Sequence, residues 1–383
     1  MTSTAATDPS PDFARQTEEV DALWIAYSRR ENDRVPLFFA CDEQLWLKVA
    51  GETFGRFYSD PRVHLKAQLE GKRWFANNVI GDMRPGPPNT WNIGVQLWMH
   101  ENEFFGCEVV YQDDDYAWGM PLDLPREDLL RHLADIEPVA RVRGNSAFRM
   151  WEALRELADG LQFDGHPVHV VAPGGGTHGI LTKAAEIRGP QRLCLDFYEA
   201  PDFVDELLRL VTEKTLDRIR AWHRLTTGGE LDLPMWEGFH FADDSLQLIS
   251  PSSYERFVLP YHERLYSAMT TGPRGMHLCG HSAQHFELLY RTLNVTILDG
   301  PGPFVDHAHY LREFGPDFTL QAQLDHSILE RGSPADIDHM MRDLLRPGCK
   351  LPGRFQVMGF LTRHTPLRNV RACYESALAH GRL

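Results

Sequence analysis

Short apolar runs alternate with longer amphipathic segments along the second half of the chain. Between Pro201 and about Arg220, apolar residues recur every three or four positions, which predicts a helix. Short apolar or β-branched runs predict strands at 167–172, 231–236, 275–278, 295–298, 318–321 and 354–358. Most of these runs are apolar throughout, as expected of parallel strands that are covered on both faces. Helical segments follow them, so the pattern predicts a parallel α/β fold, and its regular spacing favours a closed (β/α)8 barrel, the TIM barrel, over an open sheet.

Three of the predicted helices share one start signal. Ser250-Pro251, Ser333-Pro334 and Thr365-Pro366 each place a hydroxyl at the N-cap and Pro at the first helical position. The hydroxyl can accept a hydrogen bond from an unpaired backbone N–H, and Pro has no N–H to leave unpaired. These pairs therefore predict helices that begin near residues 251, 334 and 366.

The first part of the chain is less regular. Residues 1–14 are small and polar and are expected to form a flexible tail. Residues 15–140 are rich in Trp, Asp and Pro and predict an irregular N-terminal elaboration at the barrel mouth, whereas residues 141–383 carry the regular β/α repeats. No GxGxxG motif follows an early strand, which disfavours a dinucleotide-binding fold. We expect residues 15–383 to form one barrel domain.

Charge and composition exclude several classes of protein. The 383 residues include 54 acidic and 39 basic side chains, a formal charge of −15, without a basic stripe that would bind nucleic acid. No apolar run approaches the roughly 18 residues of a membrane span, and the start lacks the regions of a signal peptide. The six cysteines are scattered without a CxxC pair, which is typical of a reducing compartment. We therefore expect a soluble, cytoplasmic protein.

The most reactive-looking motif follows the predicted strand at 275–278. Active sites of α/β barrels lie at the C-terminal ends of the strands. His277 and Cys279 are separated by one residue there. In an extended segment such residues point the same way, so the pair could present an imidazole and a thiolate to one zinc ion. The alternative is a buried histidine beside an unreactive core thiol.

A second cluster lies in the aromatic and acidic run 236–244. Glu237, His240 and Asp243 are candidates for metal ligands or acid–base groups, since the run follows another predicted strand. Asp306, near a further strand end, is a candidate for orienting bound groups. The alternative for the run is a solvated loop with a helix-capping aspartate.

The remaining candidates are contacts to a cofactor. Gly174 and Gly175 belong to the glycine run 174–176, whose backbone N–H groups could cradle an anion, although such runs are often only tight turns. Gln323 lies at the end of the strand predicted at 318–321. Each of these residues, taken singly, is more often structural.

The motifs have a recognisable order. In chain order they are Asp33-Arg-Val-Pro36, Arg188-Gly189 with Pro201, Ala242-Asp-Asp, Ile249-Ser-Pro, Tyr254, Pro260-Tyr261, His277-Leu-Cys-Gly, Val305-Asp306, Phe314-Gly315, Ala322-Gln-Leu-Asp325 with Leu329, Gly332-Ser-Pro, Thr365-Pro366 and Asn369-Val370. This order resembles the uroporphyrinogen decarboxylase superfamily, in particular its corrinoid-dependent methyltransferase branch, and the resemblance is strongest from Asp243 to the end. It implies a (β/α)8 barrel.

The resemblance also implies a chemistry. Methyltransferases of this branch hold zinc with an HxC motif and a later cysteine, and the zinc activates a thiol that takes a methyl group from a methylated corrinoid. His277 and Cys279 match the first two ligands, but Gly359 stands where the later cysteine is expected. Cys349, Glu237, His240 or Asp243 then completes the site, or zinc has been lost. The Arg-rich substrate motif of the decarboxylases is absent, which disfavours porphyrinogen decarboxylation.

Three functional hypotheses follow. The leading one is zinc-assisted methyl transfer between a corrinoid, as methylcobalamin or on a partner corrinoid protein, and a small thiol or a methoxy or methylamino substrate, with His277, Cys279 and Cys349 as metal ligands. The second is a metal-free decarboxylase or lyase acting on a small carboxylated molecule, for which Asp243 and Asp306 are essential. The third is a non-catalytic barrel that binds a corrinoid or a partner. A second copy of the chain, in a homodimer, is a further candidate partner.

Overall fold

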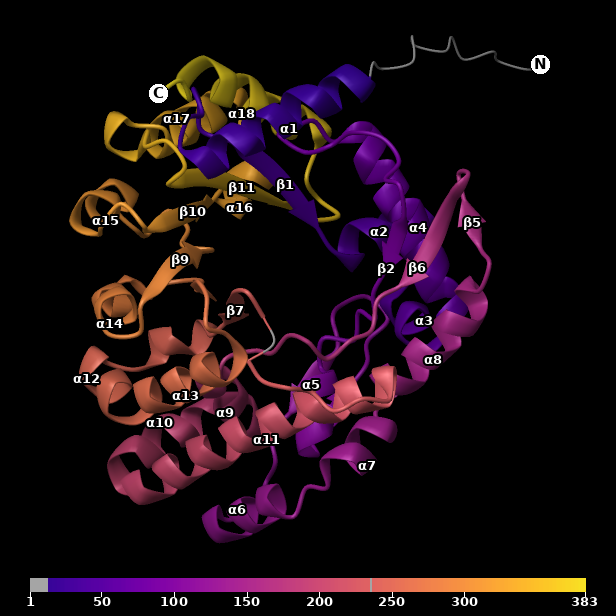
Figure 1. Cartoon of the computed structure of the whole chain (residues 1–383), viewed down its shortest axis with the longest axis vertical. Coiled ribbons are helices and arrows are strands. Elements are labelled where there is room, and N and C mark those ends of the chain that lie inside the picture. The colour runs from indigo at the N-terminus through magenta and orange to yellow at the C-terminus, as the bar shows by residue number, and fades with distance from the viewer. Residues whose placement is uncertain (1–12, 235) are drawn as a thin grey trace.

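Parallel strands form a ring in the computed structural model, which describes residues 13–234 and 236–383 (Figure 1). Six strands pair in the order β1-β11-β10-β9-β8-β7. Their bounds are β1 (Leu37–Cys41), β7 (Phe239–Ala242), β8 (Arg274–His277), β9 (Val295–Asp299), β10 (Thr319–Gln323) and β11 (Phe355–Leu361). A second arc pairs β2 (Trp91–Ile93) with β6 (His166–Val170) in parallel, and β5 (Gln162–Phe163) joins β6 in antiparallel. The two arcs supply the strands of a (β/α)8 barrel, so the predicted fold is confirmed.

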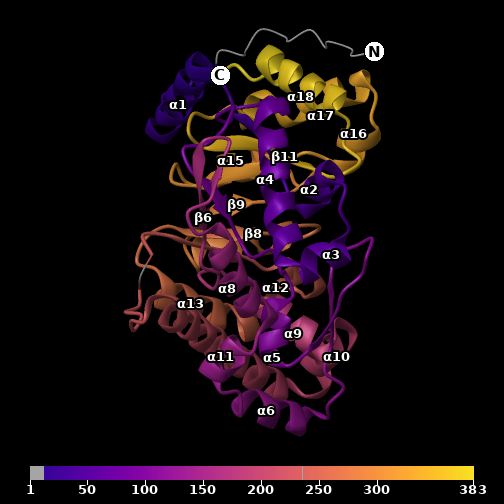
Figure 2. The same cartoon turned by 90° about the vertical axis from the view of Figure 1, so that its right-hand side faces the viewer.

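Helices surround this ring of strands (Figures 1 and 2). In chain order they are α1 (Phe13–Arg29), α2 (Glu43–Ala50), α3 (Phe54–Ser59), α4 (Pro61–Asn78), α5 (His100–Phe105), α6 (Arg126–Ala134), α7 (Pro138–Arg143), α8 (Ser146–Ala158), α9 (Ile180–Arg188), α10 (Pro190–Glu199), α11 (Pro201–Thr227), α12 (Pro251–Ser253), α13 (Leu259–Met269), α14 (Phe286–Arg291), α15 (His307–Glu313), α16 (His326–Arg331), α17 (Pro334–Leu344) and α18 (Leu367–His380). A small hairpin joins β3 (Glu108–Val110) to β4 (Trp118–Met120). No helix among the described residues is long and apolar enough to cross a bilayer.

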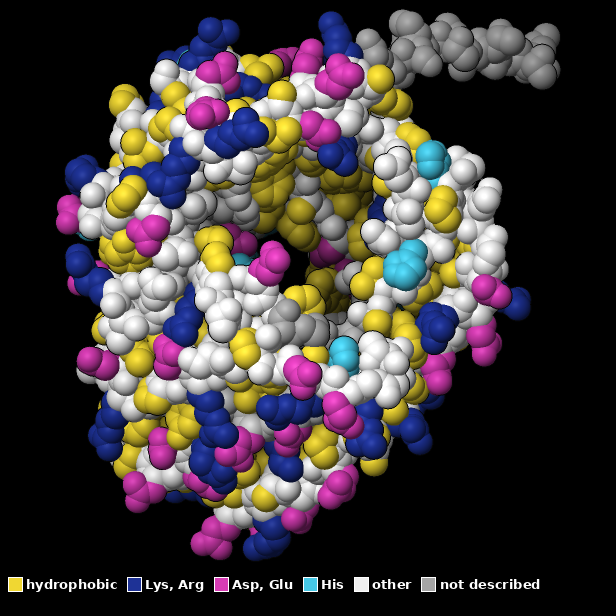
Figure 3. Space-filling model, in the orientation of Figure 1, with side chains coloured by type: hydrophobic (Ala, Val, Ile, Leu, Met, Phe, Trp, Pro, Cys, Tyr) yellow, Lys and Arg dark blue, Asp and Glu magenta, His cyan; other side chains and the backbone are white. Residues whose placement is uncertain are grey.

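Strand alternation decides which side chains face the inside of the barrel. Along β11, buried residues alternate with half-buried ones, and the buried ones, such as Val357, pack outward against the helix layer. The half-buried positions face the lumen. Residues paired across a parallel ladder point to the same side, so one row crosses the sheet through Ala242, His277, Asp299, Gln321 and Gln356. Figure 3 shows the opening at the centre of the ring.

Two of the predicted helix starts are confirmed and one is wrong in detail. The Ser250 hydroxyl accepts from the N–H of Ser253, and Ser333 forms a capping box at α17. The Thr365 hydroxyl instead accepts from the N–H of Thr362, so it closes a turn before α18 and caps no helix.

The prediction of a strand at 231–236 is wrong. The strand lies later, at Phe239–Ala242, where buried Phe239 and Phe241 alternate with His240. Asp232 and Pro234 interrupt the earlier run, and Pro cannot donate to a ladder. Met235, in that run, lies outside the described residues, as do residues 1–12 of the predicted tail; Phe13 and Ala14 begin α1.

The N-terminal part does more than decorate the mouth. Residues 15–140 contain β1, which pairs with β11 along its whole length, and β2, which pairs with β6. Both strands are short and lie far apart in the sequence, with three helices between them. Their periodicity was therefore too weak to distinguish them from the surrounding irregular segments.

Candidate metal centre at the ends of β7 and β8

Three side chains meet where β7 and β8 end. Among the described residues, Asp244, His277 and Cys279 form the group whose potential ligand atoms all lie within 4.8 Å of one another. The Nε2 atom of His277 lies 3.1 Å from Sγ of Cys279 and 3.9 Å from Oδ1 of Asp244. That same Oδ1 accepts the N–H of Cys279 at 2.7 Å, which fixes the carboxylate beside the thiol. The HxC pair predicted from the sequence therefore points at one position and gains Asp244.

The His277 ring is held from behind by Asp299. Its Nδ1 donates to Oδ1 of Asp299 at 3.1 Å, so Nε2 faces the cysteine. Burial alone would lower the pKa of this imidazole, but the bonds to Asp299 and Cys279 raise the pKa to about 10. Burial alone would raise the pKa of Asp299, but His240 and His277 lower it to about 2. A carboxylate on the far nitrogen of a ligating histidine is the usual outer partner of a metal site.

A hydrogen-bonded chain extends this support across the lumen. Oδ1 of Asp299 also accepts from Nε2 of His240 at 3.1 Å, and Oδ2 lies 3.5 Å from the Gln321 amide. The Gln356 amide donates to Gln321 at 2.8 Å. His240 thus lies one layer below His277, with 45% of its side chain exposed. A cavity of about 430 Å³ borders His240 from the N-terminal ends of the strands.

The structure does not bring Cys349 to this group. Cys349 is fully buried in a short 3₁₀ turn (Pro347–Cys349) that packs on α15, and burial raises the pKa of its thiol to about 11. Gly359 also faces the wrong way. A Cβ on Gly359 would lie 2.5 Å from the Phe39 ring, on the outer face of the sheet, whereas Met358 and Phe360 face the lumen.

Asp243 and its neighbour Asp244 have different surroundings. Asp243 has no exposed surface, and its carboxylate accepts from the N–H groups of Leu181 and Thr182 at the start of α9 and from Nε2 of His262 at 2.8 Å. It ties β7 to two helices, and no surface is left for a substrate to touch. Asp244 turns the other way, to Cys279.

Two more of the predicted acidic residues lie away from the group. Glu237 precedes β7, so it lies at the N-terminal end of the strand, opposite His277 and Cys279. Its placement follows from the shifted strand described above. Asp306 is the exposed N-cap of α15, where it accepts from the N–H of His309 and pairs with Arg346.

The residues predicted to contact a cofactor lie around the mouth. Gly174 has φ +101°, and a Cβ there would meet Trp222 at 2.3 Å, so the turn itself requires glycine. A Cβ on Gly175 would lie 3.1 Å from Trp236. Gln323, on the lumen side of β10, lies 2.6 Å from the His326 ring. Anion binding by this loop and cofactor contact by Gln323 stay predictions.

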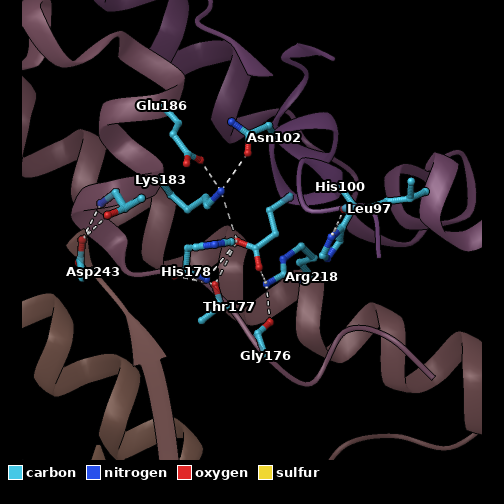
Figure 4. Close-up of polar contacts among 12 residues, drawn as sticks. Leu97, His100, Asn102, Gly176, Thr177, His178, Lys183, Glu186, Arg218 and Asp243 are labelled. Carbon is cyan, nitrogen blue, oxygen red and sulfur yellow. Dashed lines mark hydrogen bonds and ion pairs between the residues drawn. The ribbon is translucent and has the colours of Figure 1, made fainter. Parts of the chain in front are cut away.

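A buried charge cluster beside the same mouth had no signal in the sequence. Glu101 of α5 lies 3.1 Å from Arg218 of α11, 3.6 Å from Lys183 of α9 and 3.5 Å from His178 (Figure 4). The side chains of Glu101, Arg218 and Lys183 are at most 3% exposed. These residues come from segments far apart in the chain, so only the fold reveals that they meet.

Comparison with known proteins places this barrel in a family. The uroporphyrinogen decarboxylase (URO-D) family model matches residues 99–379. The chain belongs to the uroporphyrinogen decarboxylase family. A solved structure with a similar fold is a methyltransferase from Methanosarcina mazei, with 15% sequence identity, a TM-score of 0.58, and coverage of 93% of this chain and 97% of that one. No curated protein gives a significant sequence match.

Proposed function

We propose that this member of the family is a zinc-dependent methyltransferase that moves a methyl group between a corrinoid and a small thiol. The observation that carries the proposal is the group of Asp244, His277 and Cys279 at the C-terminal strand ends, with Asp299 behind the histidine. Barrel enzymes place their chemistry at this end. The similar fold of the Methanosarcina mazei methyltransferase supports methyl transfer.

The donor set fits zinc. One imidazole nitrogen, one sulfur and one carboxylate oxygen are the kinds of ligand that zinc prefers, and three protein ligands leave a fourth position for a substrate, as in catalytic sites. Zinc held there would act as a Lewis acid that lowers the pKa of a bound thiol, or polarises the oxygen or nitrogen of a methoxy or methylamino substrate.

The residues of the chain have distinct tasks in this proposal. Asp299 accepts the Nδ1–H of His277 and so directs Nε2 to the metal position. The N–H of Cys279 orients Asp244. We propose that the methylated corrinoid binds free or arrives on a partner protein at the open mouth.

The metal-free alternative has less support from the geometry. It required Asp243 and Asp306 at the reacting centre. Asp243 is fully buried in bonds to α9 and His262, and Asp306 is an exposed helix cap paired with Arg346. The methyl transfer proposal needs neither of them.

Metal analysis tests the ligand set. Protein purified without chelator should contain about one zinc per chain, and His277→Ala, Cys279→Ser and Asp244→Asn should each lose most of it. Cys349→Ser should retain zinc, since Cys349 is buried on α15. Cys194→Ser is the matched control for Cys279→Ser, because Cys194 is half-buried like Cys279 but lies on α10, away from the candidate metal centre. Zinc near zero in the unsubstituted chain, or unchanged in Cys279→Ser, would refute the proposal.

A turnover assay tests the reaction. Methylcobalamin and 2-mercaptoethanol are incubated with the zinc-loaded protein, and demethylation of the corrinoid is followed by its absorbance. We expect turnover that disappears in Cys279→Ser and persists in Cys349→Ser. Corrinoid binding without turnover in any variant would favour the non-catalytic barrel instead.

A further inference from the structure

His178 lies at the join between the two arcs of the barrel, one strand away from the candidate metal centre. It forms a parallel bridge with Ala242, and Ala242 is the register partner of His277. Neighbouring strands are about 4.8 Å apart, so the Cα atoms of His178 and His277 are separated by roughly 10 Å. Paired residues point to the same side, so the side chains of His178, Ala242 and His277 form one row that faces the lumen.

The free edge of the His178 ring is identified by its burial. Nδ1 is buried and lies 3.5 Å from Oε2 of Glu101, yet 32% of the side chain is exposed. The exposed part is therefore the opposite edge, which carries Nε2. His240 on β7 also faces the lumen, but its Nε2 atom is hydrogen-bonded to Asp299 and so is not free to accept a proton from a substrate.

Two cations offset the negative charge of the Glu101 carboxylate beside His178. Arg218 and Lys183 face the Glu101 carboxylate, and Lys183 also pairs with Glu186 (Figure 4). These two cations balance the two carboxylates of Glu101 and Glu186. The backbone N–H of His178 donates to the Glu101 carboxylate at 3.3 Å, which holds His178 in place.

We propose that His178 is a further catalytic residue, the proton acceptor for a thiol substrate that binds over Ala242 between the two histidines. The inference rests on the proposed function. The S–H bond breaks, its electron pair stays on sulfur as the thiolate directed toward the Asp244, His277 and Cys279 group, and the proton moves to Nε2 of His178. Glu101 stabilises the imidazolium that results. No oxidant or further reactant is needed.

Two structural features support this placement. Ala242, between His178 and His277, has the smallest side chain in the row, and a larger residue there would occupy the position proposed for the thiol. The proton acceptor and the metal group come from different arcs, so a substrate that touches both would bridge the join.

Calorimetry of thiol binding tests the proposal. 2-Mercaptoethanol is titrated into zinc-loaded protein at pH 8 in phosphate and in Tris, and the difference in heat gives the protons released per thiol bound. The unsubstituted protein should release fewer protons per thiol than His178→Gln, because Nε2 of His178 accepts the proton of the thiol in the complex. His178→Gln should release about one. His339→Gln is the matched control, since His339 is an exposed histidine paired with Asp343 on α17, and it should behave as the unsubstituted protein.

A second variant tests the binding position. Ala242→Val should weaken thiol binding at least tenfold without loss of zinc. Equal proton release by His178→Gln and the unsubstituted protein, with zinc and thiol still bound, would overturn the role of His178 and leave the proposed function standing. Absence of zinc and of any thiol heat in the unsubstituted protein would overturn the proposed function, and this inference with it.

Discussion

His262, His277 and His178 are among the histidines that lie against a carboxylate, and the exposure of their side chains separates their roles. His262 and Asp243 are both completely buried, so their bond joins α13 to β7 and cannot reach a ligand. The His277 side chain is 24% exposed against Asp299, and the His178 side chain is 32% exposed against Glu101. The pair of His262 and Asp243 therefore has a structural role. In His277 and His178 the carboxylate contacts one ring nitrogen, and the partial exposure of the side chain leaves the other available to a ligand.

Asp299 should determine zinc affinity without being a ligand. Asp299→Asn removes the charge behind His277, which should weaken zinc binding by about 10- to 100-fold, the usual effect of losing such an outer partner. Competition with a chromophoric chelator measures this affinity. Asp306→Asn is the control, since Asp306 is an exposed cap on α15. Equal zinc affinity in Asp299→Asn and the unsubstituted protein would show that His277 needs no carboxylate support.

Glu43 is a buried carboxyl whose protonation should affect stability. It has no exposed surface, and its Oε1 accepts from the Trp98 indole at 2.5 Å and the Tyr58 hydroxyl at 3.3 Å, while Oε2 has no partner. Burial, with a further effect of Asp42, raises the pKa of Glu43 to about 8. An unfolded chain has a carboxyl pKa of about 4.3.

The sign of the pH effect follows from these two values. Between pH 4.3 and 8 the folded chain binds more protons at Glu43 than the unfolded chain, so stability is highest below this window and falls as the pH rises through it. At about 1.4 kcal/mol per pH unit, the loss from pH 5 to pH 8 is about 4 kcal/mol. Urea unfolding at pH 5, 7 and 9 should show a smaller loss in Glu43→Gln. Parallel profiles for the two proteins would contradict the assignment.

At the scale of elements, the sequence predicts most strands of the regular β/α half. It predicts two residues of the candidate metal centre, His277 and Cys279, but not the third, Asp244. The strands at β8, β9, β10 and β11 and the HxC pair follow from local patterns. The displaced β7 shows the limit. A strand at 231–236 predicts Asp243 as an acidic residue of the site. With β7 at Phe239–Ala242, Asp243 is buried and Asp244 faces Cys279. A shift of one residue moves every side chain of a strand to the other face, so the choice between Asp243 and Asp244 depends on where the strand is placed.

Alternation along β11 makes a testable distinction between neighbouring positions. Gly359→Cys would place its Cβ 2.5 Å from the buried Phe39 ring, so overpacking should destabilise the protein by about 1–3 kcal/mol, without any gain in zinc affinity. Met358→Cys faces the lumen and should be tolerated better, because it only shortens a half-buried side chain. Urea unfolding and chelator competition compare the two. Tighter zinc binding by Gly359→Cys would mean that β11 has the opposite facing.

At the scale of the whole molecule, the ring is not equally continuous. Ladders join the strands from β1 round to β7. On the other side of β7, the backbone pairing with the segment before α9 consists of the isolated bridge of His178 with Ala242 and the bond from the N–H of Gly179 to the Ala242 carbonyl at 2.6 Å, and the Asp243 carboxylate adds bonds to the N–H groups of Leu181 and Thr182. A structural join with so few bonds should open more readily than a ladder. Neither this weakly bonded join nor the bridge of His178 with Ala242 could be inferred from the sequence, because both depend on pairing between segments that are far apart in the chain.

Hydrogen exchange should reveal this join and its link to substrate. Without zinc and thiol, the Gly179 amide should exchange faster than the Leu278 amide, which donates to Asp299 within the continuous β8–β9 edge at 3.0 Å. A thiol that spans His178 and His277 would touch both arcs and slow exchange at Gly179, while exchange at Leu278 should change little. His178→Gln should lose part of this protection and His339→Gln should keep it. If zinc and thiol left Gly179 unchanged while the thiol was bound, the substrate would lie on one arc alone.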